Sequence, residues 1–256
     1  MLPEIQKTIT EGCDYLKAQR FDKAIEVFTK VLHAKPADEK VLNYLGLAWN
    51  GKGDFDRAIY YFKEALQINP DFSEAYFNRG NAWDNKGEPE RAISDYSTVL
   101  RKRPANENAY FCRGQSYVSM GDYEKAISDF DKALNINPNL VDAYFVRGFV
   151  RMKTGDHSSA IKDLNKSIDL DPHDADAHLN RGISKVKLGD LDGAIADFSL
   201  ATKINPYLAF AYYNRGIGLA QKGLFQEALA DASKALELDP LDRRYQMLVD
   251  SLELKI

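Results

Sequence analysis

The sequence is poor in cysteine and has no long apolar run, and each lack excludes a class of protein. The two cysteines, Cys13 and Cys112, are far apart and form no CxxC pair, so we expect neither a disulfide framework nor a cysteine-rich metal site. No segment approaches the roughly 20 consecutive apolar residues that a membrane span requires. The first residues, MLPEIQKTITEGCDY, lack the basic flank and apolar stretch of a secretory signal. We therefore expect a cytoplasmic protein that does not cross a membrane.

The sequence also lacks a strong excess of charge of one sign. Lysine and arginine number 34 and aspartate and glutamate 38, giving a formal net charge of -4, and both signs are interspersed along the chain. A protein that binds the phosphate backbone of a nucleic acid usually carries a basic stripe. We therefore expect no nucleic-acid partner. A helical repeat that reads RNA bases is the alternative.

Proline recurs every 34 residues, without insertion or deletion, over most of the chain. The periodic prolines are Pro36, Pro70, Pro104, Pro138, Pro172, Pro206 and Pro240. When each proline is set at position 32 of its unit, position 8 is glycine and position 20 is alanine in all seven units. A spacing of this kind is typical of a repeat architecture. The two small residues predict a close approach between two helices of one unit, at positions 8 and 20.

A turn is predicted between these helices. Position 15 is glycine in units two to seven, and glycine readily takes the left-handed conformation that ends a helix. An aspartate follows it in four units, as Asp54, Asp122, Asp156 and Asp190, where its side chain can cap the next helix. The proline then closes the second helix because it has no amide hydrogen. Each unit is therefore predicted to be helix, tight turn, helix.

Unit two has Leu45-Gly46, Trp49, Ala58, Phe62, Ala65 and Pro70. This pattern resembles the tetratricopeptide repeat signature. Units three and four match it similarly, with Tyr76, Gly80, Trp83, Ala92 and Pro104, then with Tyr110, Gly114, Tyr117, Ala126, Phe130 and Pro138. The resemblance covers residues 5 to 240 and implies an all-α fold, a right-handed superhelical solenoid of seven helix-turn-helix repeats.

The whole chain, residues 1–256, is expected to form a single solenoid domain. The expected repeats are about residues 5–38, 39–72, 73–106, 107–140, 141–174, 175–208 and 209–242. A capping helix is expected at about residues 242–255, because Tyr245, Leu248, Val249 and Leu252 share one side of a helix there. This side would cover the apolar face of the last repeat.

Arginine at position 7 and aspartate at position 23 occur together in units three to seven and in no others. The pairs are Arg79 with Asp95, Arg113 with Asp129, Arg147 with Asp163, Arg181 with Asp197 and Arg215 with Asp231. Because both positions change together, we predict ion pairs between the two helices of each repeat. Contact of the arginines with a ligand is the alternative, and an Arg147→Ala variant that melts at a lower temperature would favour the pair.

In the tetratricopeptide family the first helix of each repeat lines a concave surface. The resemblance therefore implies that a peptide-binding groove is lined by Phe77, Asn78, Asn81, Asn85, Phe111, Gln115, Phe145, Phe149, Asn180, Tyr213 and Asn214. A carboxamide both donates and accepts, so it can bind the backbone of an extended peptide. Aromatic side chains are common anchors of interfaces. Packing of the position 5 aromatics between neighbouring helices is the alternative.

Candidate chemistry is sparse. Phosphate-binding glycine loops and the HExxH and GxSxG motifs are absent. The segment DPHDADAH at 171–178 groups possible metal ligands, but it falls in the turn between repeats, and His178 stands where four other units have tyrosine. Cys112 has no histidine nearby in the aligned positions that would activate it. We therefore expect no enzyme activity, no cofactor and no metal.

The predicted function is a non-catalytic scaffold or adaptor that binds a partner protein or an extended peptide in the groove. Domains of this family that clamp chaperone tails are expected to carry a fixed set of contact residues, which includes lysine at position 5 and asparagine at position 9 of one unit. No unit has that combination, since unit two has Asn43 with Leu47 and unit three has Phe77 with Asn81. The alternative function is a structural module that forms homo-oligomers through its repeats.

Overall fold

The computed structural model describes the backbone of residues 2–256 and the side chains from residue 4 onward. This part of the chain forms fifteen α-helices and no strand, so the all-α prediction is confirmed. None of these helices combines the length and the apolar character that a bilayer crossing would need.

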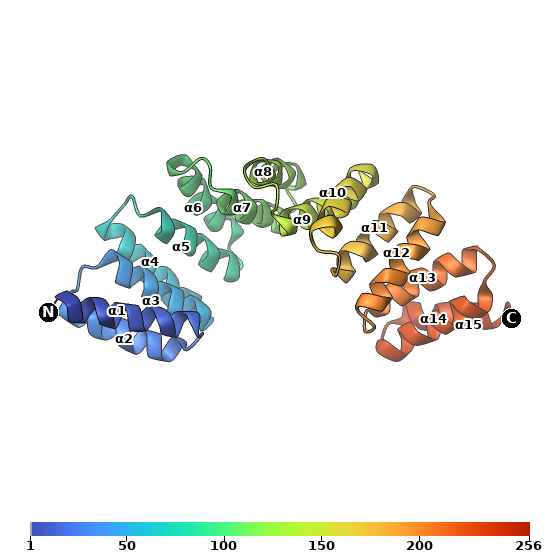
Figure 1. Cartoon of the computed structure of the whole chain (residues 1–256), viewed down its shortest axis with the longest axis horizontal. Coiled ribbons are helices and arrows are strands. Elements are labelled where there is room, and N and C mark those ends of the chain that lie inside the picture. Colours follow the sequence, from blue (N-terminus) through green and yellow to red (C-terminus); the bar gives the residue numbers. More distant parts are fainter. Residues whose placement is uncertain (1) are drawn as a thin grey trace. The chain divides into compact units, whose positions relative to one another are not determined.

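The chain divides into two compact units, Met1–Asn137 and Pro138–Ile256, whose helices are coloured in sequence order in Figure 1. The helices of the first unit are α1 (Leu2–Lys17), α2 (Phe21–Ala34), α3 (Glu39–Gly51), α4 (Phe55–Ile68), α5 (Ser73–Asn85), α6 (Pro89–Lys102), α7 (Glu107–Ser119) and α8 (Tyr123–Ile136). The helices of the second unit are α9 (Val141–Lys153), α10 (His157–Leu170), α11 (Ala175–Lys187), α12 (Leu191–Ile204), α13 (Ala209–Gln221), α14 (Phe225–Leu238) and α15 (Arg243–Glu253). The expected single domain over residues 1–256 stays a prediction.

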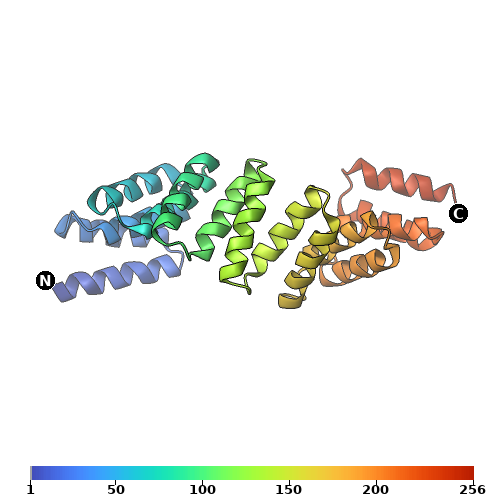
Figure 2. The same cartoon turned by 90° about the horizontal axis from the view of Figure 1, so that it is seen from above.

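Helix pairs stack in the same way inside each unit. The two helices of a repeat pack on one another, as α3 does on α4 and α11 on α12. The second helix of a repeat then contacts the first helix of the next, as α4 contacts α5 and α12 contacts α13 (Figure 2). Each 34-residue pattern therefore builds one helical hairpin, and neighbouring hairpins within a unit pack on one another.

The turns within the repeats have the predicted chemistry. Glycine at position 15 has a positive φ, between 75° and 86°, in repeats two to seven. Gln19 occupies the same position in the first repeat and has a φ of 54°. The side chain of Asp54 accepts a hydrogen bond from the amide of Arg57 at 3.0 Å, and Asp122, Asp156 and Asp190 cap their helices similarly. The sequence therefore located both the helix ends and the caps correctly.

In five repeats, the nearest neighbour of the glycine at position 8 is an aromatic ring at position 24 and not the alanine at position 20. A Cβ atom on Gly80 would lie 2.6 Å from the ring of Tyr96, and one on Gly114 would lie 2.6 Å from the ring of Phe130. Both rings come from position 24 and are buried. The alanines at position 20 are fully buried. In the seventh repeat, a Cβ atom on Gly216 would lie 3.1 Å from the carbonyl oxygen of Ala228, so the predicted approach of positions 8 and 20 is found there. In the five repeats with a ring at position 24, a larger side chain at position 8 would collide with that ring.

The last helix, α15, covers the end of the second unit. Val249 and Leu252 of α15 form a buried cluster with Ala228 and Ala232 of α14, and Leu248 packs against the edge of this cluster. Tyr245 is also buried. The predicted capping helix is therefore confirmed, because the apolar side chains of α14 would face water without it.

Candidate functional site

The arginine–aspartate pairs lie inside the repeats and hold their two helices together. In one pair, Nε of Arg113 donates to Asp129 at 2.7 Å and Nη2 donates to the other carboxylate oxygen at 2.8 Å. The other four predicted pairs have the same two-bond geometry. All five aspartates are buried. The predicted ion pairs between the two helices of each repeat are confirmed, and these guanidinium groups bind partners inside the protein.

Arg113, Arg181 and Arg215 also reach the preceding repeat, which the spacing of the residues did not predict. Nη1 of Arg113 donates to the hydroxyl of Ser97 at 2.9 Å. Nη1 of Arg181 donates to the side chain of Asn165 at 2.8 Å, and Nη1 of Arg215 donates to Thr202 at 3.0 Å. Each acceptor lies on the second helix of the preceding repeat. One arginine therefore stabilises both its own hairpin and the packing of that hairpin on the preceding one. The polar residue at position 25 of two repeats could have predicted this second contact.

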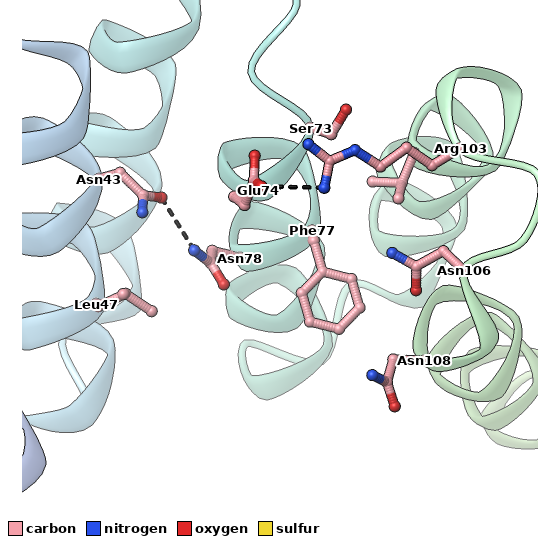
Figure 3. Close-up of a pocket in the computed structure, with 10 residues that line it drawn as sticks. Asn43, Leu47, Ser73, Glu74, Phe77, Asn78, Arg103, Asn106 and Asn108 are labelled. Carbon is pink, nitrogen blue, oxygen red and sulfur yellow. Dashed lines mark hydrogen bonds and ion pairs between the residues drawn. The ribbon is translucent and has the colours of Figure 1, made fainter.

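A pocket of ≈ 370 Å³ opens in the first unit beside α3, α5 and the start of α7 (Figure 3). Its lining residues are Asn43, Leu47, Ser73, Glu74, Phe77, Asn78, Val99, Arg103, Asn106 and Asn108. Two of them, Phe77 and Asn78, belong to the groove residues expected from the sequence. The pocket is large enough for one bulky side chain.

The apolar part of this pocket consists of Leu47, Phe77 and Val99. The ring of Phe77 lies 5.7 Å from the ring of Tyr96, centroid to centroid, and packs on the core of the repeat. Phe77 nevertheless stays half-buried and turns part of its surface to the pocket (Figure 3). Its packing and its place in the pocket are therefore compatible, because each uses a different side of the ring.

Polar groups surround the apolar part. Nδ2 of Asn78 donates to Oδ1 of Asn43 at 3.0 Å, and Asn43 is buried. Arg103 forms an ion pair with Glu74 at 3.0 Å, and about half of each side chain is exposed. Asn106 accepts from the amide of Ala109 and so caps α7. Figure 3 shows these groups around Phe77. The rim therefore offers carboxamides and one exposed pair of opposite charges.

Arg103, Asn106 and Asn108 were not predicted as groove residues. Arg103 and Asn106 stand at positions 31 and 34, after the second helix of the repeat. The expected groove residues all come from first-helix positions, whereas the bend of the chain between α6 and α7 brings these two residues to the same pocket. Asn108 is at position 2 of the next repeat, and its carboxamide close to that of Asn106 in the sequence could have predicted a polar edge to the pocket.

The other groove residues expected in the first unit have different surroundings. Asn81 accepts a hydrogen bond from the hydroxyl of Tyr96 at 2.7 Å, and Asn85 donates to Asn50 at 3.2 Å. The ring of Phe111 packs 5.8 Å from that of Phe130, whereas Gln115 is exposed. Asn81 and Asn85 thus bind neighbouring side chains of the protein itself, which reduces what they can offer to a peptide.

In the second unit, Asn214 lines a small pocket of ≈ 170 Å³ between α11 and α13. Most of its other lining residues are apolar, including Ile183, Val186 and Ile217. Nδ2 of Asn214 donates to the carbonyl of Phe210 at 2.6 Å.

The remaining predicted groove residues of the second unit are half-buried. Tyr213 packs between Phe210 and Tyr245, and Lys153 lies 5.3 Å from the ring centre of Phe149. Phe145 and Asn180 are half-buried too. None of these four residues lines the small pocket between α11 and α13.

A carboxylate lies half-buried beside the first-unit pocket residues. Asp84 accepts from the hydroxyl of Tyr96 at 2.9 Å and from that of Ser116 at 2.8 Å. Burial raises the pKa of Asp84, although both hydroxyl donors lower it. Burial also raises the pKa of the nearby Cys112 thiol to about 12, with a smaller contribution from the charge of Asp84. A thiol with such a pKa stays protonated at neutral pH and is a poor nucleophile.

His178 does not join a metal site. It is buried, its Nε2 lies 3.3 Å from the carbonyl oxygen of Pro172, and its Nδ1 lies 3.7 Å from Asp197. Across the described residues, no three histidine, cysteine, aspartate or glutamate side chains are grouped so that they could hold a metal ion.

Family models of the tetratricopeptide repeat match most of the chain. Models described as tetratricopeptide repeat match residues 9–71, 51–111, 175–207 and 209–241, and a model described as TPR repeat matches residues 114–155 and 150–189. Among curated proteins, no match was found.

Solved structures share the same architecture. YrrB, described as a TPR protein with an unusual peptide-binding site, is 28% identical and superposes with a TM-score of 0.65 over 73% of this chain and 96% of its own. MamA is 26% identical, with a TM-score of 0.61 over 63% of this chain and 95% of its own. A tetratricopeptide repeat protein from Parabacteroides merdae, at 23% identity and a TM-score of 0.67, covers 97% of this chain and 98% of its own, and shows likeness of fold.

Proposed function

Because the chain belongs to the tetratricopeptide repeat family, whose fold is a general scaffold for protein–protein interaction, we propose that it binds an extended peptide segment of a partner protein. The pocket around Phe77 is the proposed contact site. The observation that carries the proposal is the combination of an apolar floor and a carboxamide rim in one open pocket. The similarity to YrrB, a peptide-binding member of the family, supports the same class of ligand.

The chemistry of the pocket indicates how such a peptide would bind. An apolar side chain of the peptide would lie on Leu47, Phe77 and Val99, and its removal from water would supply most of the affinity. Asn78 retains its Oδ1 and one Nδ2 hydrogen for the peptide backbone, because one hydrogen already binds Asn43. Asn108 is exposed and lies at the opposite edge of the pocket (Figure 3).

The exposed pair of Arg103 and Glu74 would then affect the choice of peptide. Both side chains are about half exposed, so either can turn toward a charge of opposite sign on the ligand. We also propose that the protein is cytoplasmic and non-catalytic. The remaining groove residues of both units are proposed to contact the same peptide or partner.

The proposal is tested with peptides selected on the purified full chain from a random display library. We expect selected peptides to share an apolar residue, and we expect Phe77→Leu and Asn108→Ala to weaken their binding about tenfold, since each removes one pocket contact. Affinity is measured by fluorescence anisotropy with labelled peptides. Both variants should unfold at nearly the temperature of the unaltered protein.

Matched controls exist in the same unit. Tyr60, on α4, is 56% exposed and does not line the pocket. Asn135, on α8, is exposed and is also outside the pocket. Tyr60→Ala and Asn135→Ala should leave peptide affinity unchanged. If all four variants bind the selected peptides equally well, the pocket around Phe77 is not the binding site.

A further inference from the structure

Three aromatic rings converge on one arginine at the C-terminal end of the second unit. Phe210 and Tyr213 come from α13, and Tyr245 comes from α15. The ring centres of Phe210 and Tyr213 are 6.0 Å apart, and those of Tyr213 and Tyr245 are 5.0 Å apart. The guanidinium carbon of Arg244 lies 5.5 Å from the Phe210 centre and 5.9 Å from each of the tyrosine centres. These three rings are called the aromatic site below.

A cation is attracted to the face of each ring within about 6 Å of its centre. By contrast, Arg57 lies over Trp49 alone and Arg91 over Trp83 alone. The aromatic site therefore concentrates the attraction of three rings on one position. Tyr213 is also one of the groove residues expected from the sequence.

Arg244 is held there weakly. Its hydrogen bonds go to Asp242, two residues earlier, from Nε at 3.0 Å and 3.1 Å and from Nη2. The Arg244 side chain is 59% exposed. The Asp242 side chain is 16% exposed. Because the arginine side of this pair is largely in water, solvent weakens the attraction between the two charges. Arg244 can therefore turn away from the rings into water, and Asp242 would then be available to another cation.

We infer that the aromatic site and Asp242 together bind an arginine side chain of a partner protein, and that Arg244 occupies this place in the free protein as an internal competitor. The rings offer negative faces and Asp242 a negative charge, so the site is complementary to a guanidinium group. The group that fills it now has the same chemistry as the proposed ligand. This inference uses residues of the second unit and does not depend on the pocket around Phe77.

The test opens the site by Arg244→Ala in the full chain. The probe is acetyl-Gly-Arg-Gly-amide, titrated against isotope-labelled protein while the backbone amide signals of α13 and α15 are followed by NMR. We expect the variant to bind the probe about tenfold more tightly than the unaltered protein, because a tethered competitor at high effective concentration is removed. The same peptide with citrulline, which is nearly isosteric and uncharged, should bind neither protein measurably.

Two further variants separate the rings from simple charge. Arg243 precedes Arg244 on α15, and Arg243→Ala removes the same charge, so it should leave the affinity of the unaltered protein unchanged. Adding Tyr213→Leu to Arg244→Ala keeps apolar bulk but removes one ring, and it should abolish most of the gain, with thermal unfolding confirming the fold. The inference is overturned if Arg243→Ala gives the same gain, if Tyr213→Leu preserves it, or if the citrulline peptide binds as well.

Discussion

At the scale of single residues, buried charged side chains and their partners stabilise the packing within each repeat. The carboxylate of Asp129 is 2% exposed, and Arg113 supplies two hydrogen bonds to it and a third to Ser97 of the preceding repeat. A charge removed from water is tolerated only when a partner with good geometry replaces the lost hydration. The regular spacing of the pairs therefore reflects the packing of two helices within each repeat and not a ligand.

The first prediction concerns this ladder. Arg113→Ala leaves Asp129 buried without its partner, so the free energy of unfolding should fall by about 3 kcal/mol. Denaturant unfolding followed by circular dichroism measures the change. Arg101, an exposed residue near the end of α6, provides the control, and Arg101→Ala should change stability by less than about 0.5 kcal/mol. Equal stabilities of the two variants would show that the pair is not needed for folding.

The second prediction concerns pH. Burial raises the pKa of Asp84 in the folded protein above that of an unfolded aspartate. The folded state therefore favours the protonated carboxyl, and this contribution to stability is complete below the unfolded pKa of about 3.9 and is lost as pH rises through the raised folded pKa. Asp84→Asn does not titrate there, and its hydrogen-bonding oxygen remains. At pH 7 it should match or exceed the unaltered protein in stability.

This pH dependence is measured by unfolding both proteins in denaturant from pH 4, close to the unfolded pKa of about 3.9, up to pH 8. The stability difference should grow in favour of Asp84→Asn as the pH rises. A variant that is instead much less stable at pH 7 would mean that the charged carboxylate itself stabilises the contact with Ser116.

At the scale of elements, each helix is stabilised by its neighbours in the stack. The isolated helices are short, and helices of this length are marginal in water without packing. Most of them end in a glycine turn or are capped by aspartate, and all bury one face against an adjacent helix. The last helix, α15, has a neighbour on one side, and its buried residues come from that side.

The third prediction tests this role of α15. Leu252 is 1% exposed and packs on Ala228 and Ala232, so Leu252→Ala should reduce the free energy of unfolding by about 2 to 4 kcal/mol. Leu254, two residues later, is 90% exposed. Leu254→Ala is the matched control and should have almost no effect. If both variants are as stable as the unaltered protein, α15 does not act as a cap.

At the scale of the whole molecule, the chain has both a polar surface and exposed apolar side chains. Its net charge is -4, which favours solubility. Leu241, Leu254 and Tyr207 are 92%, 90% and 82% exposed. Exposed apolar side chains of this kind are the feature that would support the alternative function, a module that assembles with copies of itself.

The fourth prediction separates these functions. A scaffold for peptides can act as a single chain, so sedimentation velocity should give one species of 28.9 kDa at every protein concentration tested. A mass that rises with concentration, and falls again when Leu241 and Leu254 are both replaced by serine, would favour self-assembly. The double variant also serves as the control, because these residues make no contribution to the buried core.

The sequence by itself determined the repeat, its turns, its caps and the five ion pairs, because each depends on local spacing or on a residue that has few substitutes. Gly53 is needed for its positive φ wherever the hairpin lies, and Arg113 and Asp129 change together. Only the tertiary structure decided which surface side chains come together. Arg103 and Asn106, which follow α6, line one pocket with Phe77 of α5, and Arg244 of α15 lies near the ring of Phe210 of α13. Such contacts depend on how neighbouring helices pack, which the pattern within a single repeat does not specify.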